Sequence, residues 1–142
     1  MAKSSILGYP RIGRNRELKR VIEQFWSGKA SEQDVQSTAK EIRQAAWSVQ
    51  DRQGIDLIPV NDFSYYDQVL DTIALLGLVP QRYNHTASNV DIYTYFAMAR
   101  GGNGQPALEL TKWFDTNYHY LVPEFDAGNP KLSSDKPFTE FD

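Results

Sequence analysis

The segment most suited to chemistry runs from Gly8 to Lys19 and reads GYPRIGRNRELK. Two glycines bracket a loop after an apolar run, and the loop leads into an expected helix with Arg16 and Lys19 in its first turn. Backbone N–H groups at a helix start attract anions, whereas cations are normally disfavoured there. A basic helix start therefore indicates a bound anion. The spacing matches neither the P-loop nor the dinucleotide-binding fingerprint, so the residues alone do not define the ligand.

The charge distribution agrees with a local anion site. The first 20 residues hold six Lys and Arg against one acid, a local charge of +5. Since the net charge of the chain is −3, the other 122 residues carry −8. A cationic opening on an acidic chain argues against a broad nucleic-acid surface. From charge alone, the alternative is a solvated helix end with scattered basic residues.

A second stretch, Glu109 to Tyr120, places hydrogen-bonding groups over aromatic side chains. This mixture is typical of a loop that orients a polar ligand beside an apolar wall. It is equally typical of a core strand with polar ends, and both interpretations stay open.

Metal binding and acid–base catalysis have weak support in the residues. The chain contains no cysteine, and its only histidines are His85 and His119, too few for the three or four ligands of a zinc site. We expect His119 to be a hydrogen-bonded, partly buried ring. Asp67 and Asp71 share a helix face and Asp62 lies in the preceding turn, where capping or solvent exposure is a commoner role than catalysis.

The composition predicts a soluble, cytoplasmic chain. With 142 residues, 41% hydrophobic and 13% aromatic, it can form one core, either one domain or part of a larger one. The first residues do not form a signal peptide, and the longest apolar stretch, Ile73 to Val79, is too short to cross a bilayer. We therefore expect no membrane partner.

Apolar periodicity predicts four helices that would position these segments. They run from Leu18 to Trp26 before Gly28, from a Ser31 cap to Gly54, from about Tyr65 to Leu76 after a Ser64 cap, and from an Asn89 cap to Ala99.

Three short apolar runs predict strands, namely Ser4 to Tyr9, Ile55 to Val60 and Tyr118 to Val122. Strands that alternate with helices indicate parallel pairing and an α/β fold. About three strands cannot close a barrel and would leave unpaired edges. We therefore expect an excerpt of a larger α/β fold, with its edges covered by self-association or by a rearranged segment.

Four motifs in order resemble cobalamin-independent methionine synthase. They are Gly8 to Arg11 with Arg16 to Lys19, Asn61 to Asp71, Ala97 to Gly101, and Thr111 to Tyr120 followed by Val122 to Phe125. The resemblance covers residues 4 to about 125. It implies that residues 1–125 are the opening βα units of an N-terminal (βα)8 TIM-like barrel, incomplete in this chain, and that residues 126–142 are a linker or truncated end.

This resemblance also implies an activity. The family transfers a methyl group from 5-methyltetrahydropteroyltri-L-glutamate to L-homocysteine to make methionine, with zinc and without cobalamin. Its zinc ligands, one His, two Cys and one Glu, belong to a second, C-terminal barrel and have no counterpart here. The implied partners are therefore the folate triglutamate and the remainder of the enzyme, and the chain alone is expected to be inactive.

By the same resemblance, six residues contribute to binding the folate's glutamate tail: Arg16, Glu17, Leu18, Lys19, Lys112 and Asn117. Cations and an amide suit a ligand with several carboxylates. Two alternatives stay open, a stand-alone polyglutamate- or anion-binding module and a structural α/β fragment without enzymatic activity.

Overall fold

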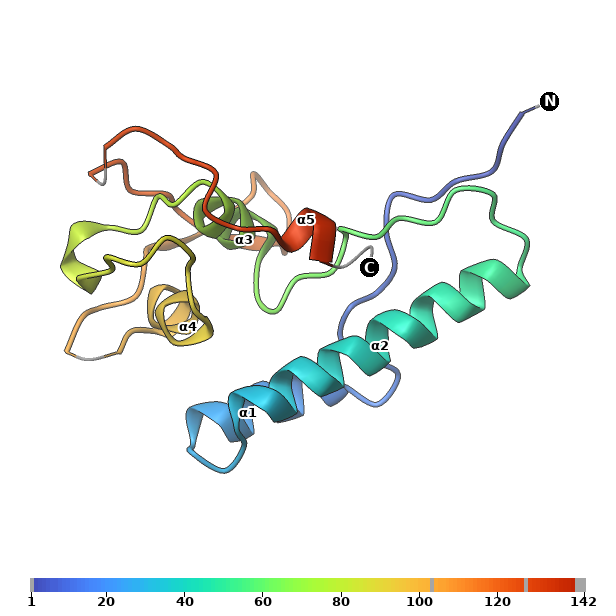
Figure 1. Ribbon diagram of the computed structural model, residues 1–142, viewed down its shortest axis with the longest axis horizontal. Coiled ribbons are helices and arrows are strands. Elements are labelled where there is room, and N and C mark those ends of the chain that lie inside the picture. The colour runs from blue at the N-terminus through green and yellow to red at the C-terminus, as the bar shows by residue number, and fades with distance from the viewer. Residues whose placement is uncertain (1, 103, 127, 140–142) are drawn as a thin grey trace. The chain divides into compact units, whose positions relative to one another are not determined.

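The computed structural model describes residues 2–102, 104–126 and 128–139 (Figure 1). The described residues divide into two compact units, one over residues 2–65 and the other over residues 66–139.

The first unit contains two helices, α1 (Glu17–Trp26) and α2 (Glu32–Arg52), which pack against each other. Their contact buries apolar side chains that recur at helical spacing, including Leu18 of α1 and Val35 of α2, both with no exposed surface. Ser31 and Asp34 form the predicted capping box at the start of α2. Both predicted helices are therefore confirmed.

The two strands expected in this unit are not regular strands. Ser4 to Tyr9 and Ile55 to Val60 meet at a single parallel bridge between Ser5 and Leu57, where the Leu57 N–H donates to the Ser4 carbonyl at 3.1 Å. The predicted parallel direction is confirmed, but the predicted length is wrong. One bridge between two segments leaves the neighbouring backbone groups without the repeated hydrogen bonds that define a strand.

The second unit contains the helices α3 (Gln68–Leu75) and α4 (Ile92–Arg100) with a 3-10 turn, η1 (Gln81–Tyr83), between them. Both helices were predicted, but both begin later than expected. The Asp67 carboxylate accepts the Leu70 N–H, and Asp91 accepts the Thr94 N–H.

These caps correct the predicted caps Ser64 and Asn89. A carboxylate that accepts the N–H three residues later satisfies one of the unpaired donors at a helix start, and this fixes the first helical residue. Asp67 and Asp91 occupy that position, each immediately before its helix.

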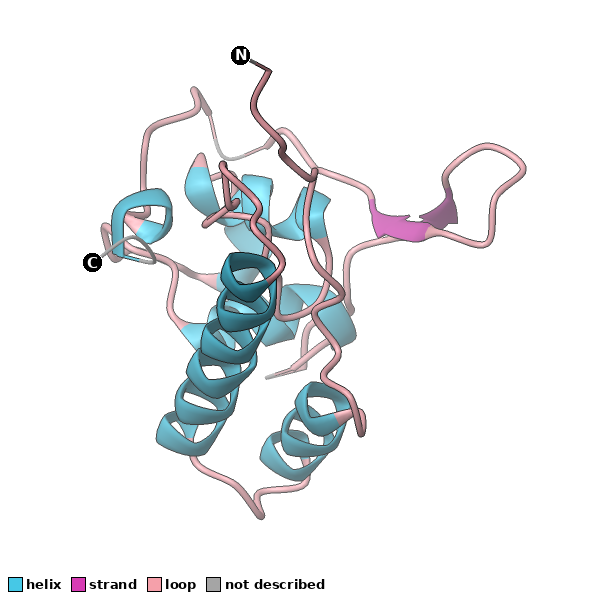
Figure 2. Ribbon diagram, turned by 90° about the vertical axis from the view of Figure 1, so that its right-hand side faces the viewer, coloured by secondary structure: helices cyan, strands magenta, loops and turns pink. Residues whose placement is uncertain are grey.

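The second unit also contains an antiparallel hairpin, β1 (Leu110–Lys112) and β2 (His119–Leu121), drawn in magenta in Figure 2. The strand expected at Tyr118 to Val122 is therefore confirmed in place, but its expected parallel pairing is wrong. Thr111 pairs with Tyr120, and the connection between the strands is too short for the crossover that parallel strands need.

The last described residues contact α3. The N–H groups of Lys131 and Ser133 donate to the carbonyls of Leu76 and Leu75 at 2.9 and 2.7 Å. A short helix, α5 (Lys136–Thr139), follows. Backbone hydrogen bonds thus hold this segment against the end of α3 within the second unit.

The described residues form a mixed helix and strand structure, consistent with the predicted α/β class. Among these residues, no helix is both long enough and apolar enough to cross a membrane.

Candidate functional site

The loop before α1 is turned back onto the start of that helix. Gly13 and Arg16 both have positive φ angles, 83° and 62°. The Arg16 N–H donates to the Gly13 carbonyl, and the Leu18 N–H donates to the Ile12 carbonyl, each at 3.2 Å. A Cβ at Gly13 would collide with the Glu17 carboxylate, so this close turn requires glycine.

Glu17 organises the loop with its carboxylate. Its two carboxylate oxygens accept from the backbone N–H and the side-chain amide of Asn15 at 2.9 and 3.2 Å. Hydrogen bonds from the backbone N–H groups of Glu17 itself and of Asn15 hold the pKa of Glu17 below its ordinary value. The carboxylate is therefore ionised at neutral pH, and its oxygens accept hydrogen bonds within the loop.

Of the four predicted site residues in this region, Arg16 and Lys19 present their side chains to solvent. The Lys19 ammonium lies 3.6 Å from the Glu23 carboxylate, in an exposed pair of small energetic value. Leu18 is fully buried. The side chains of Leu18 and Glu17 thus support the helix start, while two cations face outward.

The other two predicted site residues lie on the hairpin of the second unit. Lys112 ends β1 opposite His119, and Asn117 lies in the turn. The turn is closed by the Trp113 N–H, which donates to the Tyr118 carbonyl at 2.8 Å. Lys112 and Asn117 are both exposed and lie at the same end of the hairpin.

His119 differs from its prediction in one respect. Its Nδ1 lies 3.1 Å from the Asn117 carbonyl oxygen, as a hydrogen-bonded ring requires, but its side chain is exposed. The expected partial burial is therefore wrong, because His119 begins β2 next to the exposed turn, and burial rises along the strand only toward Leu121.

The structure thus gathers the predicted residues into two groups. Arg16 and Lys19 lie together at the start of α1, and Lys112 and Asn117 lie together on the hairpin. The first group belongs to the first unit and the second group to the second unit.

The hairpin is anchored by a carboxylate that the sequence did not connect with it. Asp67 is only 4% exposed, and it accepts a hydrogen bond from the Tyr118 hydroxyl. It also accepts the Leu121 N–H at 3.3 Å and the Leu70 N–H at 3.0 Å. The capping role of Asp67 could be found from sequence, because an Asp three residues before an apolar helix position is a capping signal. Its contacts with Tyr118 and Leu121 could not, because these residues lie about fifty positions away in the chain.

The neighbouring acids also serve structural contacts. Asp62 accepts the Tyr9 N–H at 2.7 Å, and Asp71 accepts the Tyr95 hydroxyl at 2.6 Å. Asp67 caps α3. The predicted capping role is therefore confirmed for Asp67.

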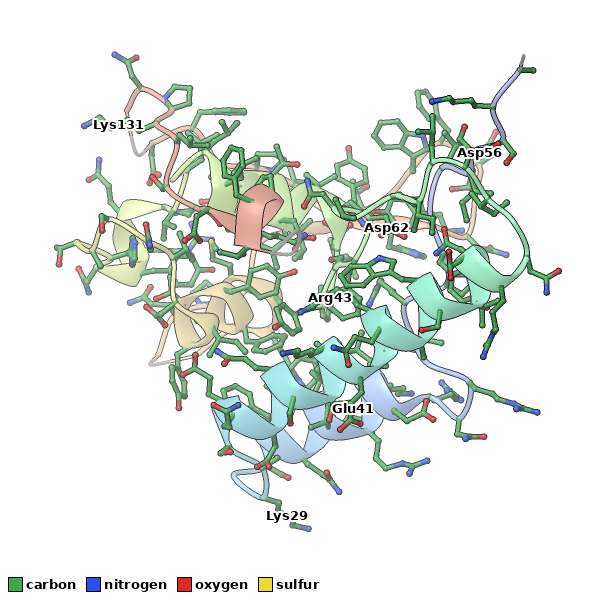
Figure 3. All side chains as sticks on the ribbon, turned by 45° about the vertical axis from the view of Figure 1, so that its right-hand side comes forward. Lys29, Glu41, Arg43, Asp56, Asp62 and Lys131 are labelled. Atoms are coloured by element: carbon green, nitrogen blue, oxygen red, sulfur yellow. The ribbon has the colours of Figure 1, made fainter. Side chains whose placement is uncertain are left out.

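A groove of about 810 Å³ adjoins the loop within the first unit. One wall includes Gly13, Arg14 and Glu17. The opposite wall is a face of α2 that includes Ile42, Val49 and Glu41, the last labelled in Figure 3. A largely apolar groove beside a cationic loop can receive an elongated molecule with an apolar part and a charged part.

Metal ligands are not gathered in the part of the chain that the structure describes. Outside residues 1, 103, 127 and 140–142, no three His, Asp or Glu side chains lie close enough together to hold a metal ion. These residues do not fit a zinc site.

Residues 3–142 match the family model described as "Cobalamin-independent synthase, N-terminal domain". The chain therefore belongs to this family, and the resemblance inferred from the four motifs is confirmed.

Relatives in this family are similar along nearly the whole chain. A protein of Bifidobacterium adolescentis is 54% identical over 99% of this chain and 19% of its own length. Proteins of Salinibacter ruber and of Oryza sativa subsp. japonica are 48% and 50% identical, over 100% and 97% of this chain and 20% and 18% of their own lengths. Each bears the name 5-methyltetrahydropteroyltriglutamate–homocysteine methyltransferase, with a final "1" for the Oryza protein. The chain spans about one fifth of the length of these relatives.

Proposed function

We propose that this chain is the N-terminal portion of a zinc-dependent methyltransferase. The whole enzyme transfers a methyl group from 5-methyltetrahydropteroyltri-L-glutamate to L-homocysteine, without cobalamin, and so makes methionine. The observation that carries this proposal is the identity of 48 to 54% with relatives that bear this substrate pair in their names.

In the whole enzyme, residues 1–125 contribute the opening βα units of a (βα)8 barrel. The order of elements supports this proposal. An extended segment is followed by two helices and then by a second extended segment. The two extended segments pair at the parallel bridge between Ser5 and Leu57. This order is that of a crossover connection between parallel strands.

The portion described here contributes to binding the folate's glutamate tail. Arg16 and Lys19 supply exposed cations at a helix start, where backbone N–H groups also favour an anion. Lys112 and Asn117 supply a further cation and an amide from the hairpin end. In this proposal Glu17 and Leu18 hold the helix start in place rather than contact the tail with their side chains.

Zinc and homocysteine are assigned to the remainder of the enzyme. The described residues of this chain do not gather a ligand set for zinc. The chain alone should therefore neither retain zinc nor transfer a methyl group. Metal analysis after dialysis tests the first statement, and a methionine-forming assay with homocysteine and the triglutamate folate tests the second; stoichiometric zinc or methionine formation would contradict the proposal.

Tail binding is tested by calorimetry at low salt. The 142-residue chain is titrated with the triglutamate and the monoglutamate forms of 5-methyltetrahydrofolate, and the same is done for Lys19→Ala and Lys112→Ala. The control is Lys29→Ala, which removes an exposed lysine from the turn after α1 (Figure 3). Exposed ionic contacts are worth about 1 kcal/mol or less and are screened by salt, so the affinity should be weak.

The triglutamate should bind more tightly than the monoglutamate in the parent chain and in the Lys29→Ala control. Both Lys19→Ala and Lys112→Ala should reduce this preference. Equal binding of the two folates by the parent chain, or an unchanged preference in both lysine variants, would show that these residues are structural.

A further inference from the structure

The hairpin that carries Lys112 and Asn117 has little apolar anchorage of its own. Each strand has three residues, and within the two strands Leu121 is the fully buried side chain. Two-stranded hairpins are at best marginally stable in water without further packing. The orientation of the hairpin end therefore depends on the contacts that hold β2 to the rest of its unit.

Asp67 supplies those contacts. Its carboxylate accepts the hydroxyl of Tyr118, immediately before β2, and the N–H of Leu121, at the end of β2. The same carboxylate caps α3 through the Leu70 N–H. One buried group thus links the hairpin to the first turn of a helix.

We propose that Asp67 and Tyr118 are positioning residues for the folate tail, an inference that rests on the proposed function. Tyr118 directly follows Asn117, and its carbonyl accepts the Trp113 N–H next to Lys112. The hydrogen bond from its hydroxyl to Asp67 therefore fixes the position of both tail-binding residues relative to α3.

The energetics favour a firm contact. Asp67 is a buried carboxylate, and among the described residues its hydrogen-bond donors are the neutral groups of Leu70, Leu121 and Tyr118. A buried charge is costly when its hydrogen bonds are not made, and a bond to an ionised acceptor is stronger than one between neutral groups. Loss of the hydroxyl leaves two backbone donors on Asp67, so the helix cap persists while the hairpin end loses a fixed point.

The clean test substitution is Tyr118→Phe, which removes one hydroxyl and keeps the ring. The matched control is Tyr83→Phe, because the Tyr83 hydroxyl donates to the Pro106 carbonyl at 2.7 Å elsewhere in the same unit. The 142-residue chain, both variants, Lys112→Ala and the double variant Tyr118→Phe with Lys112→Ala are titrated with the triglutamate and monoglutamate folates at low salt. The readout is the ratio of the two affinities, which a general loss of stability would not change selectively.

We expect Tyr118→Phe to lower this ratio about threefold to fivefold, as when one exposed ionic contact is lost, and Tyr83→Phe to leave it unchanged. In the Lys112→Ala background, Tyr118→Phe should have a smaller effect than in the parent chain, because only Asn117 is then left for it to position. In Asp67→Asn the amide oxygen can still accept the Leu70 and Leu121 N–H groups, while the amide N–H donates to the Tyr118 hydroxyl oxygen. This variant should therefore keep the affinity ratio, whereas Asp67→Ala should lower it.

The outcomes separate this proposal from the proposed function. If Lys112→Ala lowers the ratio and Tyr118→Phe does not, the positioning role is overturned and the tail site stands. Additive losses in the double variant would also overturn it, because Tyr118 would then act independently of Lys112. If neither substitution changes the ratio, the tail site on the hairpin and its positioning residues are both wrong.

Discussion

The carboxylate of Asp56 accepts two hydrogen bonds from Ser4, from its backbone N–H at 2.7 Å and from its hydroxyl at 2.8 Å. The Asp56 N–H in turn lies 3.0 Å from the Ser4 hydroxyl oxygen. These contacts flank the parallel bridge between Ser5 and Leu57. They join two segments that the sequence separates by about fifty residues, and they complete the pairing of the first unit.

Protonation of Asp56 should contribute to the loss of stability of the first unit in acid. The hydrogen bond from the Ser4 backbone N–H, followed by that from its hydroxyl, lowers the pKa of Asp56 from its ordinary value. A lowered pKa means that this stabilisation is fully present above the ordinary aspartate pKa and is lost as the pH falls through the lower pKa of the folded state. We expect Asp56→Ala to reduce stability at neutral pH and to flatten its dependence on pH below about 4.

Urea unfolding between pH 2 and 7 measures this dependence. The control is Asp51→Ala, which removes an exposed carboxylate from α2. An identical pH profile for the parent chain and Asp56→Ala would contradict the role assigned to Asp56.

Gly13→Ala should destabilise the chain more than Gly28→Ala. Both glycines have positive φ, 83° and 72°, where a side chain costs about 1–2 kcal/mol. A Cβ at Gly28 meets no atom within 4 Å, whereas one at Gly13 displaces the Glu17 carboxylate from its hydrogen bonds with Asn15. The difference between the two free energies of unfolding, measured by urea denaturation, isolates the loop contact. Equal losses would show that the Glu17 carboxylate moves aside without cost.

The helices could be predicted from sequence because their signals are local. The apolar face of α1 and the Ser31–Asp34 capping box of α2 lie within one or two turns of the positions they specify. The start of α3 was missed because Ser64 and Asp67 are both acceptable caps by residue type. Asp67 also accepts the N–H of the distant Leu121, a contact that no local pattern signals.

The strands and the site could be predicted only in part. The antiparallel pairing of the hairpin was missed because Leu110 to Lys112 lacks the apolar run of a buried strand, and its outer residues are exposed. The motif resemblance assigned both Leu18 and Lys19 to the binding of the folate tail. Burial now separates them, since Leu18 lies in the core and Lys19 faces solvent.

Lys136→Met should destabilise the second unit by about 1–2 kcal/mol. The Lys136 ammonium lies 3.0 Å from the Asp71 carboxylate, whose side chain is only 10% exposed. Without the cation, the Asp71 carboxylate keeps the hydrogen bond from the Tyr95 hydroxyl. The free-energy cost of burying its charge is then no longer offset by the ion pair. Thermal unfolding of Lys136→Met is compared with that of Lys131→Met, which removes an exposed lysine from the same segment. A loss in the control as large as that in Lys136→Met would rule out the ion pair as the cause.

Self-association of the 142-residue chain should depend on the segments that flank the Ser5–Leu57 bridge. Leu57 is 53% exposed and Leu7 is fully exposed, although both lie on segments with the composition of buried parallel strands. Apolar segments of this kind with unpaired backbone groups template further pairing, so a second copy can cover them. Sedimentation over a wide concentration range should show an average mass that rises with concentration, and Leu57→Lys should shift the chain toward the monomer. The control is Leu132→Lys, the same change at a 70% exposed leucine of the second unit, which should leave the association unchanged. A stable monomer at every concentration, or an equal effect of both substitutions, would show that these segments do not drive association.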